Sequence, residues 1–177
     1  MSTSSKPNIY LVGFMGTGKS TIGRQLAERL DYQFLDSDAE IERISGMTIP
    51  DLFKEQGESV FRKMEKEFVD SGHPAEGCVV SCGGGLIFQE GLKELLQEKG
   101  IVISLFASAE TIYKRTRTNA NRPLLAVEDP MAEIQALLEK RLPVYQAAGI
   151  GVLTDDRTLN EIVEHIIRIY RRKLRSP

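Results

Sequence analysis

The segment that most constrains this chain is GFMGTGKS, residues 13 to 20, which matches the pattern G-x-x-x-x-G-K-[ST]. An apolar stretch, Ile9 to Val12, precedes it, and an amphipathic segment, Lys19 to Leu30, follows it. A strand, a glycine-rich turn and a helix in this order form a phosphate-binding loop, or P-loop. Inward-turned N–H groups and the helix N-terminus both favour an anion there.

The residue types within this loop predict its ligand. Lys19 is placed to reach the β and γ phosphates as a point charge, and the Ser20 hydroxyl is placed to bind the magnesium that bridges them. We therefore expect ATP with Mg²⁺ as the bound nucleotide. The residues expected to contact it are Gly13, Gly16, Thr17, Gly18, Lys19, Ser20 and Thr21.

Short apolar stretches alternate with longer amphipathic segments along the rest of the chain, which predicts a parallel sheet covered by helices. We expect an α/β fold with three layers, α/β/α, and five parallel strands at residues 9–12, 33–35, 78–80, 101–106 and 151–153. Thr158 and Glu161 have the spacing of a capping box, which predicts the start of a last amphipathic helix.

Composition narrows the possible classes of protein. The chain has 177 residues, 41% of them hydrophobic, which is enough for one core, so we expect a single domain over residues 1 to 177 and a monomer. A net charge of −2 argues against nonspecific binding to nucleic acid or an anionic membrane. The basic residues 171 to 175 fit a solvated helix end, with a nucleic-acid or membrane patch as the alternative.

The cysteines and the N-terminal residues bear on location. Cys78 and Cys82 have no second cysteine pair and no nearby histidine, which argues against zinc and favours reduced core residues over a disulfide. Reduced cysteines fit a reducing compartment. Residues 1 to 8 are polar, and no run of about 18 apolar residues occurs anywhere. We therefore expect a cytoplasmic protein without a membrane partner.

Two carboxylates, Asp36 and Asp38, follow the expected second strand. Enzymes with a P-loop usually hold magnesium with an aspartate after a later apolar strand, but here that strand reads VVSCG at residues 79 to 83. Ligands bind at the C-terminal edge of a parallel sheet, so Asp36 and Asp38 are placed to supply the missing acid. In an extended segment both would face one cavity, one toward the metal and one toward a substrate hydroxyl. The alternative is that an aspartate here only caps the next helix.

The apolar period disappears between Thr116 and Pro130, where residues 118 to 123 read TNANRP. Clear helical patterns flank this polar segment on both sides. We interpret residues 116 to 130 as a loop that forms a mobile lid.

These motifs, taken in order, resemble the shikimate kinases, small kinases of the nucleoside-monophosphate-kinase class of P-loop folds. The resemblance covers nearly the whole chain. It is carried by GFMGTGKS, the Asp36/Asp38 pair, FRKME at 61–65 after Gly57-Glu58, GGG at 83–85, RPLL at 122–125 and R-x-P-x-Y at 141–145. It implies transfer of the γ-phosphoryl of ATP to the 3-hydroxyl of shikimate, giving shikimate 3-phosphate and ADP for aromatic amino acid biosynthesis.

The resemblance also implies roles for individual residues. The catalytic residues would be Lys19, Asp38 and Arg122, with Arg122 in the lid stabilising the transferring phosphoryl group. The substrate-binding residues would be Asp38 at the ring hydroxyls, Arg62 and Arg141 at the carboxylate, and Gly83, Gly84 and Gly85 through the backbone. Magnesium would bind Ser20 and Asp36. Arg115 and Arg122 would contact the nucleotide, although Leu159 stands where a proline usually joins Arg115 at the adenine.

Plainer interpretations exist for these residues. Arg62 and Glu65 have the i,i+3 spacing of an ordinary surface pair, the three glycines fit a loop after a strand, and a loop arginine is usually solvated. Two functions compete with a shikimate kinase. One is a kinase for gluconate or another small hydroxy acid, because paired arginines do not specify the ring. The other is a noncatalytic regulator that binds nucleotide or shikimate.

Overall fold

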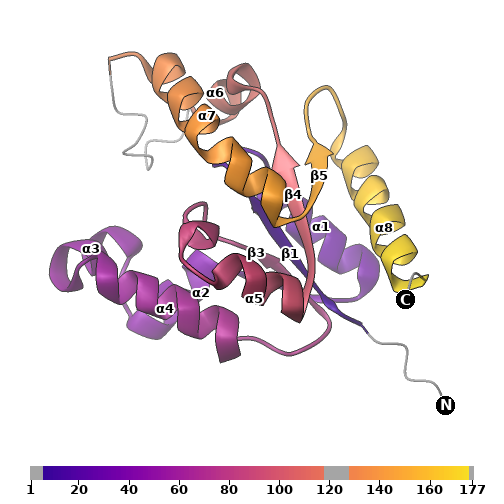
Figure 1. Cartoon of the computed structure of the whole chain (residues 1–177), viewed down its shortest axis with the longest axis horizontal. Helices are drawn as coiled ribbons and strands as arrows, with labels where there is room; N and C mark the ends of the chain where they lie inside the picture. The colour runs from indigo at the N-terminus through magenta and orange to yellow at the C-terminus, as the bar shows by residue number, and fades with distance from the viewer. Residues whose placement is uncertain (1–5, 118–127, 176–177) are drawn as a thin grey trace.

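Five parallel strands form the central sheet of the computed structural model, which describes residues 6–117 and 128–175 (Figure 1). The strands lie in the order β2-β3-β1-β4-β5. Their bounds are Asn8–Gly13 for β1, Gln33–Asp36 for β2, Cys78–Ser81 for β3, Gly100–Phe106 for β4 and Ile150–Leu153 for β5. The expected five-stranded parallel sheet is confirmed, with strand ends that differ from the expected ones by at most one residue.

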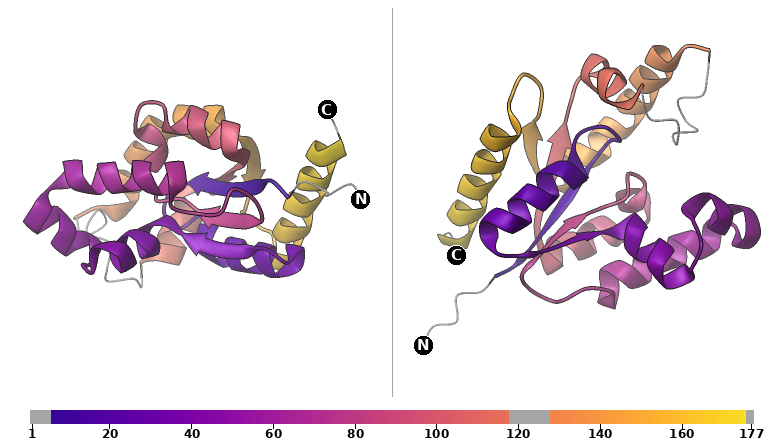
Figure 2. Two further views of the ribbon diagram at one scale, coloured as in Figure 1. Left: turned by 90° about the horizontal axis from the view of Figure 1, so that it is seen from below. Right: turned by 180° about the vertical axis from the view of Figure 1, so that it is seen from behind.

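Helices cover both faces of the sheet (Figure 2). Successive residues of β1 alternate between the two faces, so Ile9 and Leu11 lie in one buried cluster and Tyr10 and Val12 in the other. The first cluster is covered by α1 (Lys19–Leu30) and α8 (Leu159–Arg175). The second is covered by α4 (Glu58–Ser71), α5 (Leu92–Lys99), α6 (Ala109–Thr116) and α7 (Pro130–Ala148).

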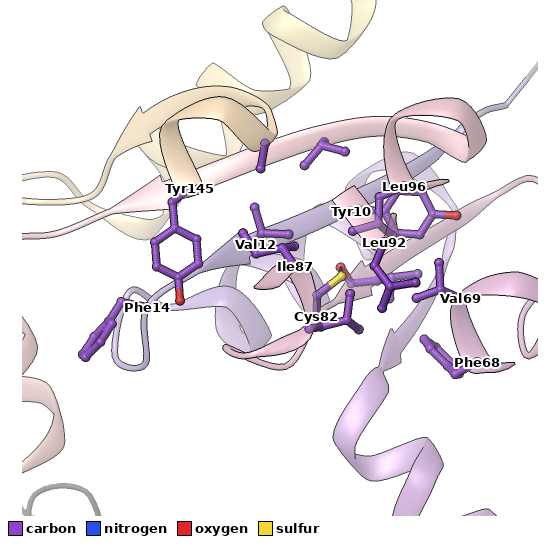
Figure 3. Close-up of a cluster of buried hydrophobic side chains, with 14 of the residues drawn as sticks. Tyr10, Val12, Phe14, Phe68, Val69, Cys82, Ile87, Leu92, Leu96 and Tyr145 are labelled. Carbon is purple, nitrogen blue, oxygen red and sulfur yellow. Dashed lines mark hydrogen bonds between the residues drawn. The ribbon is translucent and has the colours of Figure 1, made fainter. Parts of the chain in front are cut away.

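Figure 3 shows part of the second cluster, including Tyr10, Cys82 and Tyr145. Both cysteines belong to this cluster and are free and buried, as expected. A smaller apolar cluster joins α4 to α2 (Ser37–Ser45) and α3 (Ile49–Gln56), which lie together beside the sheet in Figure 1. These helices extend the molecule next to the end of β2.

Strand register brings several chain segments to one edge of the sheet. Asp36 at the end of β2 lies opposite Ser81 at the end of β3. Leu11 of β1 pairs with the same Ser81, and Gly13 at the end of β1 pairs with Leu105 of β4. Because all strands are parallel, the P-loop and the segments that follow β2 and β3 emerge side by side.

The helix predicted over Lys19 to Leu30 is confirmed, and so is the capping box before α8. The Thr158 N–H donates to Glu161 Oε2 at 2.7 Å, and the Glu161 N–H donates to Thr158 Oγ1 at 3.3 Å. Most of the expected lid, including Arg122, lies outside the described residues, so that interpretation stays a prediction. Within the described ranges, no helix is long and apolar enough to span a bilayer.

Candidate active site

The P-loop has the backbone that its glycines predict. Gly13, Gly16 and Gly18 have φ values of 145°, 76° and 97°, which favour glycine over any residue with a Cβ. A Cβ at Gly13 would also lie 2.5 Å from the Leu105 carbonyl oxygen. Lys19 Nζ donates to the carbonyl oxygens of Gly13 and Phe14 at 2.9 and 3.0 Å. The ammonium group is thus held over the loop, on the side where phosphate is expected.

A group of three side-chain oxygens lies beside the loop. Ser20 Oγ donates to Asp36 Oδ2 at 2.8 Å and lies 3.2 Å from Ser81 Oγ. Ser81 was missed from the sequence, although its position at the end of β3, where an aspartate is usual, was the available signal. Asp36 Oδ1 accepts weakly from the N–H groups of Asp38 and Ala39, at 3.2 and 3.4 Å.

Asp36 is therefore the N-cap of α2, and the helix begins at Ser37. The expectation that Asp36 and Asp38 belong to one extended segment is wrong, because an aspartate that caps a helix starts that helix at the next residue. Both carboxylates still line the same cavity. The sequence presented helix capping and cavity lining as alternatives, but Asp36 does both.

Asp38 is the least satisfied polar side chain at the site. Its Oδ1 atom is buried and has no hydrogen-bond partner among the described residues. Burial raises the pKa of this carboxyl, and the charge of Asp36 adds to the shift, while Lys19 opposes it. A buried carboxylate oxygen without a donor is costly, and a hydroxyl group of a ligand would satisfy it.

The three glycines after β3 provide space for functional side chains. A Cβ at Gly83 would lie 2.6 Å from Asp38 Oδ1, and a Cβ at Gly85 would lie 2.9 Å from Arg62 Nη1. None of the three has a positive φ, so space and not backbone conformation requires glycine at 83 and 85. Two hydroxyl groups hold this turn: Ser37 Oγ accepts from the Gly83 N–H, and the Tyr145 hydroxyl donates to the Gly84 carbonyl, both at 2.8 Å.

Arg62 is held by two carboxylates on α4. Its Nη1 donates to Glu65 Oε2 at 2.8 Å, and its Nε and Nη2 donate to Glu58 Oε1 at 3.0 and 2.9 Å. Glu65 is only 1% exposed, so this is not an ordinary surface pair. Gln89 Nε2 also donates to Glu65 Oε2, at 2.6 Å. Burial raises the pKa of Glu65 to about 7, against the opposing effect of Arg62.

Replacing Glu65 with glutamine is expected to change how stability depends on pH. The unfolded chain releases the Glu65 proton near pH 4.5, whereas the folded chain keeps it to about pH 7. The wild type should therefore lose free energy of unfolding, relative to Glu65→Gln, as the pH rises from 4.5 through 7. The loss is at most about 3 to 4 kcal/mol, from about 1.4 kcal/mol per pKa unit.

Urea denaturation of both proteins at several pH values measures this difference. Glu67→Gln is the matched control, because Glu67 lies on the same helix with a side chain 63% exposed and paired with Lys63. It reports how the loss of one carboxylate from the surface of this helix changes stability. A pH-independent difference between Glu65→Gln and the wild type would contradict the raised pKa of Glu65.

A cavity of about 540 Å³ joins the P-loop to the acidic pair and the glycine turn. Of the expected site residues, those that line it are Gly16, Thr17, Gly18, Lys19, Ser20, Thr21, Asp36, Asp38, Gly83, Gly84 and Arg115. Gly13, Gly85, Arg62 and Arg141 do not line the cavity itself, although Gly13 lies beside Gly84 and Arg62 beside Gly85. Arg141 instead lies over the rings of Phe14 and Phe88, with 5.6 and 5.4 Å from its guanidinium carbon to the ring centroids.

The other end of the cavity contains Arg115 and Leu159. Arg115 Nη1 donates to the Gly16 carbonyl and to Thr154 Oγ1, at 3.2 and 3.1 Å, which ties α6 to the P-loop. Thr154 and Arg157 also line the cavity and were missed from the sequence, because the loop after β5 carries no recognisable motif. Leu159 is 36% exposed at the first position of α8.

Replacing Leu159 with proline is expected to lower the KM for ATP by about twofold to tenfold, because a rigid ring has no side-chain freedom to lose on contact with adenine. The helix should tolerate this change, since proline is favoured at the first helical position. Leu159→Ala, which removes the apolar surface, should raise the same KM. Steady-state kinetics at saturating acceptor measure both, and an unchanged KM in both variants would exclude an adenine contact.

Comparison with known proteins shows the family of this chain. The family model for shikimate kinase matches residues 15–171. A shikimate kinase of Thermus thermophilus is 47% identical over 160 residues, covering 90% of this chain and 87% of the relative. That of Thermodesulfovibrio yellowstonii is 39% identical over 165 residues, covering 93% and 95%.

Solved structures give the same result. The shikimate kinase of Acinetobacter baumannii, in complex with shikimate, superposes with a TM-score of 0.88 and 39% identity, covering 96% of each chain. The family match extends from within the P-loop to the last helix, and it includes the acidic pair, the glycine turn and Arg141. On its sequence and on its fold, this chain belongs to the shikimate kinase family.

Proposed function

We propose that this chain transfers the γ-phosphoryl group of ATP to the 3-hydroxyl of shikimate. The observation that carries the proposal is the Asp38 carboxylate, whose buried Oδ1 has no donor among the described residues and which shares a cavity with Lys19 and Ser20. An acceptor hydroxyl bound there would satisfy Asp38 and lie near the phosphate loop. The similarity to shikimate kinases, including one solved with shikimate, supports this choice of acceptor.

In the proposed reaction, Asp38 orients the 3-hydroxyl and accepts its proton. The hydroxyl oxygen forms a bond to the γ-phosphorus while the bond from that phosphorus to the bridging oxygen breaks, and ADP leaves. The raised pKa of Asp38 suits this role, because a general base works best when its pKa is closer to the working pH. Lys19 stabilises negative charge on the transferred group and on the leaving ADP.

Magnesium is part of the proposal, and the available ligands fit it. Ser20 Oγ and Asp36 Oδ2 lie 2.8 Å apart beside the P-loop, and both are oxygen atoms, which Mg²⁺ prefers. Sites of this kind complete the coordination shell with phosphate oxygens and water. Bound there, Mg²⁺ would neutralise charge on the phosphates.

The remaining proposed contacts concern the carboxylate and the nucleotide. Arg62 and Arg141 would bind the shikimate carboxylate, with the Gly84 N–H at a ring hydroxyl and Gly83 and Gly85 in contact with the ring. Arg115 would contact adenine. Arg122, which lies outside the described residues, would reach the γ phosphate from the lid. We also propose a single domain that acts as a cytoplasmic monomer without nucleic acid, which the free buried cysteines and the net charge of −2 support.

Measuring ADP release with a panel of acceptors tests the proposal. Shikimate should give turnover well above the rate without acceptor, whereas gluconate, which lacks the ring, should not. Higher turnover with gluconate would favour the related hydroxy-acid kinase. Binding of shikimate and an ATP analogue in calorimetry, without any ADP release from ATP, would favour a noncatalytic regulator.

A further inference from the structure

The two arginines proposed to bind the carboxylate are held in opposite ways. The Arg62 guanidinium is neutralised by Glu58 and Glu65, which occupy its Nε, Nη1 and Nη2 groups. Arg141 forms no ion pair with a carboxylate in residues 6–117 and 128–175. The two guanidinium groups therefore differ in how much positive charge and how many N–H groups they can offer to a ligand.

Aromatic rings take the place of the missing carboxylate at Arg141. Its guanidinium carbon lies 5.6 Å from the ring centroid of Phe14 and 5.4 Å from that of Phe88, within the range of a cation–π interaction. Burial raises the pKa of the nearby Tyr145 hydroxyl, and the charge of Arg141 opposes this rise. A ring face attracts the cation without accepting its N–H hydrogens in strong bonds, so the edge of the guanidinium stays available for a bidentate contact with a carboxylate.

The three aromatic residues come from three separate elements of the site. Phe14 follows Gly13 in the P-loop and is 1% exposed. Phe88 ends the short helix η1 (Leu86–Phe88) after the glycine turn, and its ring meets the Tyr145 ring at 83° with 5.5 Å between centroids. Tyr145 on α7 is buried and lies at the same end of the cluster as Phe14 in Figure 3. The rings are held by packing, which limits where Arg141 can lie.

We propose that Phe14 and Phe88 are positioning residues that hold Arg141 with its N–H edge free, so that Arg141 supplies most of the selectivity for a carboxylate substrate. Arg62, whose charge is already balanced, contributes less to that selectivity. The inference rests on the proposed function only in taking shikimate as the carboxylate that is bound. It extends that function by naming the residues that act on substrate specificity through Arg141.

Phe88 is the better residue to test, because it is 40% exposed, whereas Phe14 is 1% exposed, and its replacement should disturb the core less. Phe88→Leu removes the ring face and is expected to raise the KM for shikimate about three- to tenfold, with a much smaller change in kcat and in the KM for ATP. Phe88→Tyr keeps the ring and should restore most of the affinity. Leu142→Ala is a matched control, because Leu142 is the exposed neighbour of Arg141 on α7.

A charge-specific measurement separates positioning from packing. Shikimate methyl ester has the same ring without the charge, so the ratio of kcat/KM for shikimate over the ester reports carboxylate selectivity. Phe88→Leu should lower this ratio, and Arg141→Ala should lower it on the order of 30-fold or more. Arg62→Ala should lower the ratio less than Arg141→Ala. In the Arg141→Ala background, adding Phe88→Leu should change nothing further.

The outcomes distinguish this inference from the proposed function. If Phe88→Leu lowers activity on shikimate and on its ester equally, or acts fully in the Arg141→Ala background, the positioning role is wrong. If Arg62→Ala costs more selectivity than Arg141→Ala, the assignment of selectivity to Arg141 is wrong. Failure of the wild type to phosphorylate shikimate would instead overturn the proposed function.

Discussion

Asp38→Asn is expected to lower turnover by about 10²- to 10⁴-fold, the usual loss when a general base is removed. Asparagine has nearly the same shape but cannot accept the hydroxyl proton. ATP binding should change little, because Lys19, Ser20 and the P-loop backbone are untouched. Steady-state assays of ADP release measure turnover, and calorimetry measures nucleotide affinity.

The same variant should not be less stable than the wild type. Burial raises the pKa of Asp38, so its contribution to stability is full at low pH and is lost as the pH rises through the folded-state pKa. At neutral pH and above, replacement by a neutral amide removes the cost of the buried charge, and Tm should stay constant or rise. Asp70→Asn, at an exposed position on α4, is the control for both measurements. Near wild-type turnover for Asp38→Asn would remove Asp38 from the mechanism.

Lys19→Met is expected to lower kcat by about 10²- to 10³-fold, because a preorganised positive charge at the transferring phosphoryl group is lost. Methionine keeps the apolar stem of lysine without its ammonium group. The affinity for ATP should fall more than that for ADP, and the affinity for adenosine should be nearly unchanged, because the phosphates are the part of the nucleotide that Lys19 is expected to contact. The carbonyl groups of Gly13 and Phe14 also lose their donor, so a small fall in Tm is expected.

Calorimetric titration with ATP, ADP and adenosine measures how the affinity changes with the number of phosphates. Lys66→Met, at an exposed position on α4, should leave all of them unchanged. An equal loss for adenosine and ATP would mean that the substitution damages the fold of the P-loop, and it would contradict a specific phosphate contact.

Much of the site followed from local sequence. The P-loop could be predicted from its glycines and from the apolar strand before it. Gly13, Gly16 and Gly18 have positive φ, and a Cβ at Gly13 would clash with the backbone of Leu105, so the conformation of the loop depends on glycine at these positions. The spacing of Thr158 and Glu161 predicted the start of α8 for a similar reason, since a capping box involves only neighbouring residues. Asp36 and Asp38 were expected beside the P-loop and do line its cavity, but the sequence left open whether they face a ligand or cap the next helix, because a single aspartate serves equally well as a cap and as a ligand.

The sequence by itself determined the phosphate loop, the parallel sheet and the family, because these depend on residue type, on short spacings and on the order of motifs. Only the tertiary structure decided which side chains meet. The burial of Glu65, the crowding of Asp38 and Arg62 against Gly83 and Gly85, and the aromatic contacts of Arg141 all join elements distant in the chain. Such contacts follow from how the helices pack on the sheet. A local sequence pattern therefore does not predict the distances between these side chains or how far each is buried away from water.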